Sequence, residues 1–222
     1  MVPTALIYSE FYNNRGGLGV IQYNEADAKV MIEDVTAKNN ALSGMYLSGT
    51  GITVNNANIR DNDVAGLVIG NNIENEITLA GDVSITNNVN GFLTLPAAQG
   101  TVRVTGNLIS NRNVVGLLPL SDNFTIAVGG SYSGKSGKNG SGSLTACDNG
   151  QYDIYNFGGS TFEGSDYTCD TKAGTDLPVC KPCHPGCPSP EPDESSFQIL
   201  SAAFEINELD FADHMDHGEI PV

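Results

Sequence analysis

The fold of this chain is decided by a short stretch that recurs along it, and its clearest copy reads Ile59-Arg60-Asp61-Asn62-Asp63-Val64-Ala65-Gly66-Leu67. An apolar residue is followed by a polar pair that usually contains Asn, then by a short turn, Gly and an apolar strand. Four further copies start at Phe11, Ala37, Ile85 and Ile109. The first polar residue falls at positions 13, 39, 61, 87 and 111, so the repeat is 22 to 26 residues long.

Each repeat also contains a second short strand of alternating character, as in Ile52-Thr53-Val54 and Val102-Arg103-Val104. Strands this short, with no helical period between them, do not suit βαβ units. If each repeat is one turn of a coil, equivalent residues lie about 4.8 Å apart and inward aliphatic side chains form continuous ladders. An antiparallel β-sandwich is the alternative fold, but it does not explain Asn at one phase of five successive repeats.

The repeat resembles the right-handed parallel β-helix superfamily, the fold of pectate-lyase-like proteins, over about residues 4–170. The resemblance implies an all-β, right-handed parallel β-helix solenoid of about five to seven coils with a Cys/Pro-rich C-terminal tail. We therefore expect a parallel β-helix at 1–170 and a Cys/Pro-rich cap and linker at 171–192. An acidic tail with a short helix is expected at 193–222, where Ser195 and Gln198 fit a capping box.

The polar pairs predict a structural ladder at one corner of the coil. Asn and Asp tolerate left-handed backbone geometry, and an amide can bond the same amide one coil along. Residues 39, 61, 87 and 111 should align vertically. The predicted ladder comprises Asn39, Asn40, Asp61, Asn62, Asn87, Asn88 and Asn111.

The residue two places after each Gly of the repeat predicts an interaction face. If the residue directly after Gly points inward, the next one points outward. The outward set is apolar and comprises Tyr46, Val68, Leu93 and Leu118. Such a stripe on a soluble protein indicates a covered or partner-binding face. The alternative is a β-bulge that turns these residues inward, since Thr94 and Pro119 fit the interior poorly.

Five cysteines gather at one end of the chain: Cys147, Cys169, Cys180, Cys183 and Cys187. They predict a disulfide-stapled terminus in an oxidising compartment. We expect a Cys147–Cys169 bridge that closes the last coil, with further pairing among the other three. The alternative is zinc bound by Cys180, Cys183, His184 and Cys187.

The chain is expected to be extracellular or at the cell surface. Its Cys-rich end resembles predicted secreted microalgal β-helix proteins, and Asn123 and Asn139 lie in glycosylation sequons. The net charge of −16 makes nucleic acid an unsuitable partner, since phosphate contacts need clustered Lys and Arg. No apolar run reaches the length of a membrane span, so no membrane insertion is expected.

The sequence offers little catalytic chemistry. Polygalacturonase-like hydrolases carry Asn-Thr-Asp, Asp-Asp, Gly-His-Gly and Arg-Ile-Lys motifs, and none occurs in this chain. The candidates for a lyase site are Arg60, Asp61 and Asp63, with calcium as the cation that such a site would use. No other cofactor is expected.

The sequence thus predicts a non-catalytic module for structural, adhesive or glycan-contact roles, with a polysaccharide or another protein domain as partner. The alternative is a fragment of a polysaccharide lyase or hydrolase whose active site lies partly on missing coils.

Overall fold

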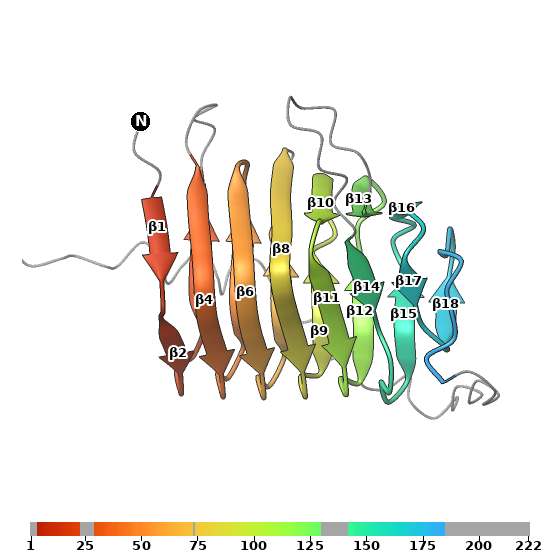
Figure 1. The fold of residues 1–222 in the computed structure, drawn as a ribbon, viewed down its shortest axis with the longest axis horizontal. Coiled ribbons are helices and arrows are strands. Elements are labelled where there is room, and N and C mark those ends of the chain that lie inside the picture. The colour runs from red at the N-terminus through yellow and green to blue at the C-terminus, as the bar shows by residue number, and fades with distance from the viewer. Residues whose placement is uncertain (1–3, 23–28, 73, 130–141, 185–222) are drawn as a thin grey trace, which may run out of the picture. The chain divides into compact units, whose positions relative to one another are not determined.

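The computed structural model describes residues 4–22, 29–72, 74–129 and 142–184. All paired strands in these ranges run parallel and stack as a β-helix of about 6 turns (Figure 1), which confirms the predicted fold. Parallel pairing excludes the antiparallel sandwich. No helix in the described residues is long and apolar enough to cross a membrane.

Two sheets wind along the coil. In the larger sheet the central strands are β1 (Thr4–Ile7), β4 (Val30–Lys38), β6 (Ile52–Arg60), β8 (Asn75–Thr86), β10 (Gly100–Val104), β13 (Phe124–Val128) and β16 (Thr161–Gly164). Four more strands join it: β2 (Glu10–Tyr12), β11 (Asn107–Asn111), β14 (Ser143–Thr145) and β17 (Tyr167–Thr168). The smaller sheet contains β3 (Leu18–Ile21), β5 (Ser43–Ser48), β7 (Ala65–Ile69), β9 (Asn90–Thr94), β12 (Val115–Pro119), β15 (Tyr152–Asn156) and β18 (Lys172–Gly174).

The long strands of the larger sheet bend at one position in each coil. Asp34, Asn56 and Gly81 have φ angles of 52°, 58° and 63°, and Asn56 Nδ2 donates a hydrogen bond to Asp34 Oδ1 at 3.0 Å. Left-handed backbone conformations of this kind favour Asn, Asp and Gly. The bend divides the larger sheet into two flat parts. Together with the smaller sheet, these parts give each turn of the coil three sides.

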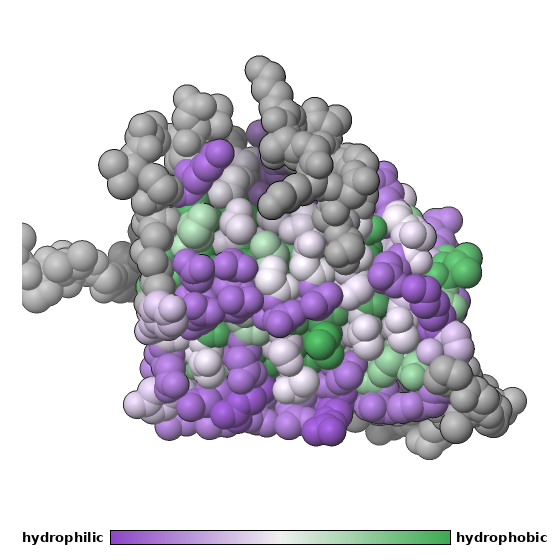
Figure 2. All heavy atoms as spheres, in the orientation of Figure 1, coloured by the Kyte–Doolittle hydropathy of each residue, from purple (hydrophilic) through white to green (hydrophobic). Residues whose placement is uncertain are grey.

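Aliphatic columns fill the interior, as the repeat predicts. The parallel register aligns one column through Ile32, Val54, Leu79, Val104 and Val128, all of them buried. On the smaller sheet, Met45, Leu67, Phe92, Leu117 and Ile154 form a second column. The outer face of the larger sheet is mostly hydrophilic or intermediate (Figure 2). Each coil buries its apolar side chains only because a neighbouring coil covers them.

The Gly of each repeat marks a point where two coils approach too closely for a side chain. A Cβ added to Gly66 would lie 2.2 Å from Ile85 Cγ2 and 2.9 Å from the carbonyl oxygen of Gly91. The same crowding recurs at Gly44, Gly91 and Gly116, each of which also lies against an Asn side chain. Gly therefore occupies this position of the repeat because there is no room for a side chain.

Replacing Gly66 with Ala is expected to lower the free energy of unfolding by about 2 kcal/mol, because the added methyl group overpacks the corner. Chemical denaturation followed by circular dichroism measures this change. Gly16→Ala is the matched control, since no atom lies within 4 Å of a Cβ added at Gly16. Equal stability of the two variants would contradict the crowding argument.

Two disulfides close the C-terminal end, but their pairing differs from the prediction. Cys147 bonds Cys183, and Cys169 bonds Cys180. Thr145 pairs with Thr168, and continuing this register places Cys147 opposite residue 170. The predicted Cys147–Cys169 bridge is wrong because the two residues are one position out of phase and face opposite sides of their strands.

The same pairing excludes the zinc alternative, because Cys180 and Cys183 are both consumed in disulfides. Cys187 lies outside the described residues, as do Asn139 and the predicted helix in the acidic tail. Strand β18 pairs with β15 and carries the sheet to Gly174, beyond the predicted boundary at residue 170. Disulfides persist mainly in oxidising compartments, so the two bridges agree with the expectation of such a compartment.

Candidate functional site

Most of the polar residues of the repeat lie at one corner of the coil. The first residue of each polar pair has a φ angle between 54° and 58° and directs its side chain away from the core. These outer-corner residues are Asn13, Asn39, Asp61, Asn87, Arg112 and Asp148. The left-handed conformation turns the chain from β2, β4, β6, β8, β11 and β14 into the following turn.

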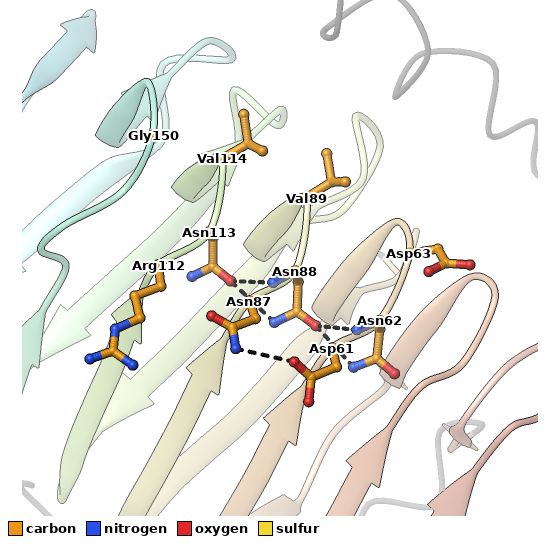
Figure 3. A pocket seen from close by; sticks show the side chains of 10 residues that line it. All are labelled: Asp61, Asn62, Asp63, Asn87, Asn88, Val89, Arg112, Asn113, Val114 and Gly150. Carbon is orange, nitrogen blue, oxygen red and sulfur yellow. Dashed lines mark hydrogen bonds between the residues drawn. The ribbon is translucent and has the colours of Figure 1, made fainter.

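The second residue of each pair forms an asparagine ladder directly behind this outer corner, buried in four coils and partly buried in the last. Its members are Asn40, Asn62, Asn88, Asn113 and Asn149. Asn88 Oδ1 accepts the backbone N–H of Asn62 at 3.0 Å and its Nδ2 at 2.9 Å. Asn88 Nδ2 in turn donates to Asn113 Oδ1 at 3.1 Å and to the carbonyl oxygen of Thr86 at 3.0 Å (Figure 3).

The ladder ends on a buried carboxylate. Asp153 Oδ1 accepts Nδ2 of Asn149 at 2.8 Å, and Asp153 Oδ2 accepts the backbone N–H groups of Asp170 and Thr171 at 2.8 and 3.0 Å. Only 2% of Asp153 is exposed. Sequence reasoning missed Asn149 and Asp153, because the repeat is 36 residues long between Asn113 and Asn149 and its spacing no longer identifies them.

The predicted alignment holds for Asn39, Asp61 and Asn87, but Asn111 is one residue out of phase. Asn111 pairs with Thr86, so Arg112 takes the place beside Asn87. The segment from residue 110 to 113 contains two asparagines, and the sequence alone cannot tell which one follows the strand. Asn111 instead accepts the backbone N–H of Cys147 through Oδ1 at 2.9 Å.

An open depression of about 520 Å³ lies at this corner, across the coils of β6, β8 and β11. Its walls combine outer-corner residues with the ladder and with Val89, Val114 and Gly150 (Figure 3). Asp61, Asn87 and Arg112 contribute a carboxylate, an amide and a guanidinium from three successive coils. The structure thus brings Asp61, Asp63 and Arg112 to one place.

The carboxylate of Asp61 is already engaged within the depression. It forms an ion pair with Nη1 of Arg60, and its Oδ1 accepts Nδ2 of Asn87 at 3.1 Å. Arg112 is exposed and directs its guanidinium away from Asp61 (Figure 3). Neither Arg112 nor Asp63 forms an ion pair within the part of the chain that the structure describes.

No group of three or more His, Cys, Asp or Glu side chains in the described ranges is arranged to hold a metal ion. Asp148 of the outer corner pairs with His184, and Asp148 Oδ1 lies 3.0 Å from His184 Nε2. The hydrogen bond to Asp148 and the charge of its carboxylate raise the pKa of His184. The Cys147–Cys183 bridge holds the two residues together, since each directly follows a bonded cysteine.

The four residues of the predicted interaction face share one column. The register aligns Tyr46, Val68, Leu93 and Leu118 on the smaller sheet, and the last three are 4%, 1% and 1% exposed. They do not belong to the central core cluster. The column is therefore not an open surface of the chain.

Sequence reasoning also missed an aromatic cluster on β15. Tyr152 and Tyr155 have ring centroids 5.2 Å apart, and the rings of Tyr155 and Phe157 are 5.8 Å apart in an edge-to-face arrangement. Burial and the neighbouring Tyr152 raise the pKa of Tyr155. The signal in the sequence was the run from Tyr152 to Phe157, which follows the last of the five copies of the repeat but lies within the predicted β-helix.

The sequon residue Asn123 is exposed at the turn before β13, where its Nδ2 donates to Asp122 Oδ1 at 2.7 Å. Its glycosylation stays a prediction. Family models, characterised proteins and solved structures contain no match to this chain.

Proposed function

We propose that this chain is a non-catalytic module, secreted or held at the cell surface, that contacts neutral glycans through the depression at the outer corner. The observation that carries the proposal is the row of three planar polar groups, on Asp61, Asn87 and Arg112, presented by successive coils. The parallel β-helix fold also supports a second part of the proposal, that the chain is related to the pectate-lyase-like proteins. The disulfides support the extracellular location.

The chemistry of the row suits sugar hydroxyl groups. A carboxylate offers acceptors, a guanidinium offers donors and an amide offers both, so together they match the mixed donors and acceptors of a sugar. The buried ladder directly behind them fixes their backbone, which reduces the entropy lost on binding. The net charge of −16 favours a neutral glycan over a polyanionic one.

The engagement of Asp61 supports a non-catalytic role. A general base has to carry off the proton that it removes, whereas donors of the chain already hold both oxygens of Asp61 and leave lone pairs suited to hydrogen bonds with a ligand. Both Arg60 and Asn87 already bond this carboxylate. Arg60 is likewise neutralised by its partner, so neither residue is poised to act on a uronate.

Replacing Arg112 with Asn is expected to weaken binding of neutral oligosaccharides by about tenfold, because the loss of one hydrogen-bonding group to the ligand costs about 1.5 kcal/mol. Asn suits the φ angle of 58° at this position, so the fold is retained. Asn87→Gly removes the neighbouring amide and should act in the same direction. Isothermal titration calorimetry with soluble β-glucan, mannan and galactan oligosaccharides measures the change.

Asn39→Gly is the matched control, since Asn39 has the same left-handed backbone but does not line the depression. Its affinity should equal that of the unmodified chain. An assay of unsaturated products at 235 nm, with pectate and alginate in the presence of calcium, should show no turnover. Turnover that Asp61→Asn abolishes would overturn the proposal and favour the lyase alternative.

A further inference from the structure

The two ends of the coil differ, and the N-terminal end is an open edge of both sheets. Among the described strands, β1 and β2 pair only with β4, and β3 pairs only with β5 (Figure 1). The backbone groups on the far side of these three strands therefore face no described strand. A row of such N–H and C=O groups is a template for pairing with the strands of another molecule.

The apolar interior also reaches this end without a full cover. The register pairs inward side chains of the first coil with those of the second: Leu6 with Ile32, Phe11 with Ala37, Leu18 with Met45 and Val20 with Leu47. All four side chains of the second coil are 0% exposed, whereas the four of the first coil are only partly buried. The difference corresponds to one neighbouring coil, because each coil is covered by the next.

At the C-terminal end the core is covered. Leu177 and Cys180 pack against the core there, and Lys181 forms a β-bridge with Thr168. The two disulfides fix this segment to the last coils, and the large side chain of Tyr167 is 1% exposed. A head-to-tail stack of molecules would have to join an open end to a covered one.

We propose that the N-terminal end of the coil is the interface of a homodimer, in which two copies meet end to end about a two-fold axis. A single extended peptide cannot pair with this end, because β1 and β3 belong to different sheets on different sides of the coil. The partner must itself have the outline of a coil end, and a second copy supplies one. The two-fold axis reverses the winding of the second chain, so the edge strands of the two copies meet antiparallel.

Exposed apolar side chains gather near this open end. In the described ranges, four of the six exposed large hydrophobic residues belong to the first two coils: Tyr8, Tyr12, Ile21 and Met31. Tyr8 is the most exposed of the four, at 80%. Aromatic residues are enriched at protein interfaces and carry much of their binding energy. The gathering of such residues at one end indicates a surface that a partner covers.

The charge and the size of the first coil suit contact with a second copy. Residues 4–22 contain one Glu and one Arg, so this stretch has a formal charge of zero in a chain whose net charge is −16. Two copies can therefore approach through this end with the least repulsion. A repeat of 22 to 26 residues also matches the roughly 20–30 residues that each partner contributes to a stable interface.

The test measures the mass of the full chain by analytical ultracentrifugation over a range of concentrations. We expect a monomer–dimer equilibrium whose mass stops at two chains. Tyr8→Asn and Ile21→Lys are each expected to weaken dimerisation by about tenfold or more. Asn suits the φ angle of 49° at position 8, so this variant keeps the local backbone. Val179→Lys is the matched control, because Val179 is 88% exposed at the covered end and should leave the dimer intact.

Hydrogen exchange gives an independent measurement of the same contact. In the dimer, the amides of β1 and β3 should exchange more slowly than in the Ile21→Lys variant, while those of β7 should not change. A monomer at every concentration overturns the proposal, as does a dimer that Val179→Lys dissociates and the other two variants leave intact. A mass that grows beyond two chains would indicate head-to-tail stacking and overturn the two-fold arrangement. Circular dichroism spectra identical to that of the unmodified chain show that the variants are folded.

Discussion

Replacing Asn88 with Ala is expected to lower the free energy of unfolding by about 4 kcal/mol, because it breaks the asparagine ladder at its centre. Asn88 is 4% exposed, and its Oδ1 is the acceptor for two donors of Asn62. The backbone N–H of Asn62 and one hydrogen of its Nδ2 would lose this acceptor in a buried place, at about 1–3 kcal/mol each, while Nδ2 keeps its hydrogen bond to the carbonyl oxygen of Ala37. Asn113 Oδ1 and the carbonyl oxygen of Thr86 would also lose the hydrogen bonds that Asn88 Nδ2 now donates to them.

Urea denaturation followed by circular dichroism measures this effect, with Asn87→Gly as the control. Asn87 is exposed, makes one side-chain hydrogen bond to Asp61, and has a φ angle of 57° that Gly adopts freely. Its replacement should cost less than about 1 kcal/mol. A loss below about 1 kcal/mol for Asn88→Ala would show that the ladder does not hold the coils together.

A third variant, Asn88→Asp, gives the ladder a pH dependence. One carboxylate oxygen can still accept from Asn62, but the other would face the oxygens of Asn113 and Thr86, which need a donor. Only the protonated acid supplies that donor, so folding raises the pKa of the new residue above its unfolded value of about 3.9. The stability of this variant should therefore be greatest below about pH 4 and fall as the pH rises, a trend absent from Asn88→Ala.

Removing the Cys147–Cys183 bridge by a double Ser substitution is expected to lower the free energy of unfolding by about 4 kcal/mol on a chain-entropy estimate. The bridge spans 36 residues, whereas Cys169–Cys180 spans 11 and should contribute about 3 kcal/mol. Thermal or urea unfolding of the two double variants measures the difference.

The loss should also be local, because each coil contacts only its neighbours. Hydrogen exchange is expected to accelerate in β15, β17 and β18 and to remain unchanged in β6 and β7. The intact chain under reducing conditions should show the same pattern, with the variants as controls. Uniform acceleration across all coils would contradict a local cap.

The sequence was sufficient for the fold because a single spacing governs each coil. Nearly constant intervals separate the successive polar pairs, such as those that begin at Asp61 and Asn87, and the Gly that follows each pair. The same residue types recur because the backbone makes the same turn at this corner in every coil. The prediction failed at Asn111 because Asn111 and Asn113 are the same residue type, and the sequence does not show which of them belongs to the ladder. It failed again for Cys147 and Cys169, because a shift of one residue in register decides which side of a strand a thiol faces.

The candidate site could be predicted from the sequence only in part. Arg60, Asp61 and Asp63 stand out in the sequence, but the bonds that engage Asp61 come from Arg60 and from the next coil. The rings of Tyr152 and Tyr155 come together along β15, and the ring of Phe157 joins them at the bend directly after it, which the spacing of the repeat does not reveal. Pairwise distances across coils depend on register, which is set by the whole stack.

The asparagine ladder has a direction, and Asp153 gives it an end. Asn40, Asn62, Asn88 and Asn113 each donate to the amide one coil on, and Asn149 donates to Asp153, so the dipoles add as the peptide dipoles of a helix do, with the positive end at Asn149. An amide at position 153 would bring a donor of its own and need another acceptor beyond it. A carboxylate brings acceptors only, accepts the last donors and neutralises the accumulated dipole. The end of the ladder is thus encoded as a change from amide to acid, where two oxygens replace an oxygen and a nitrogen.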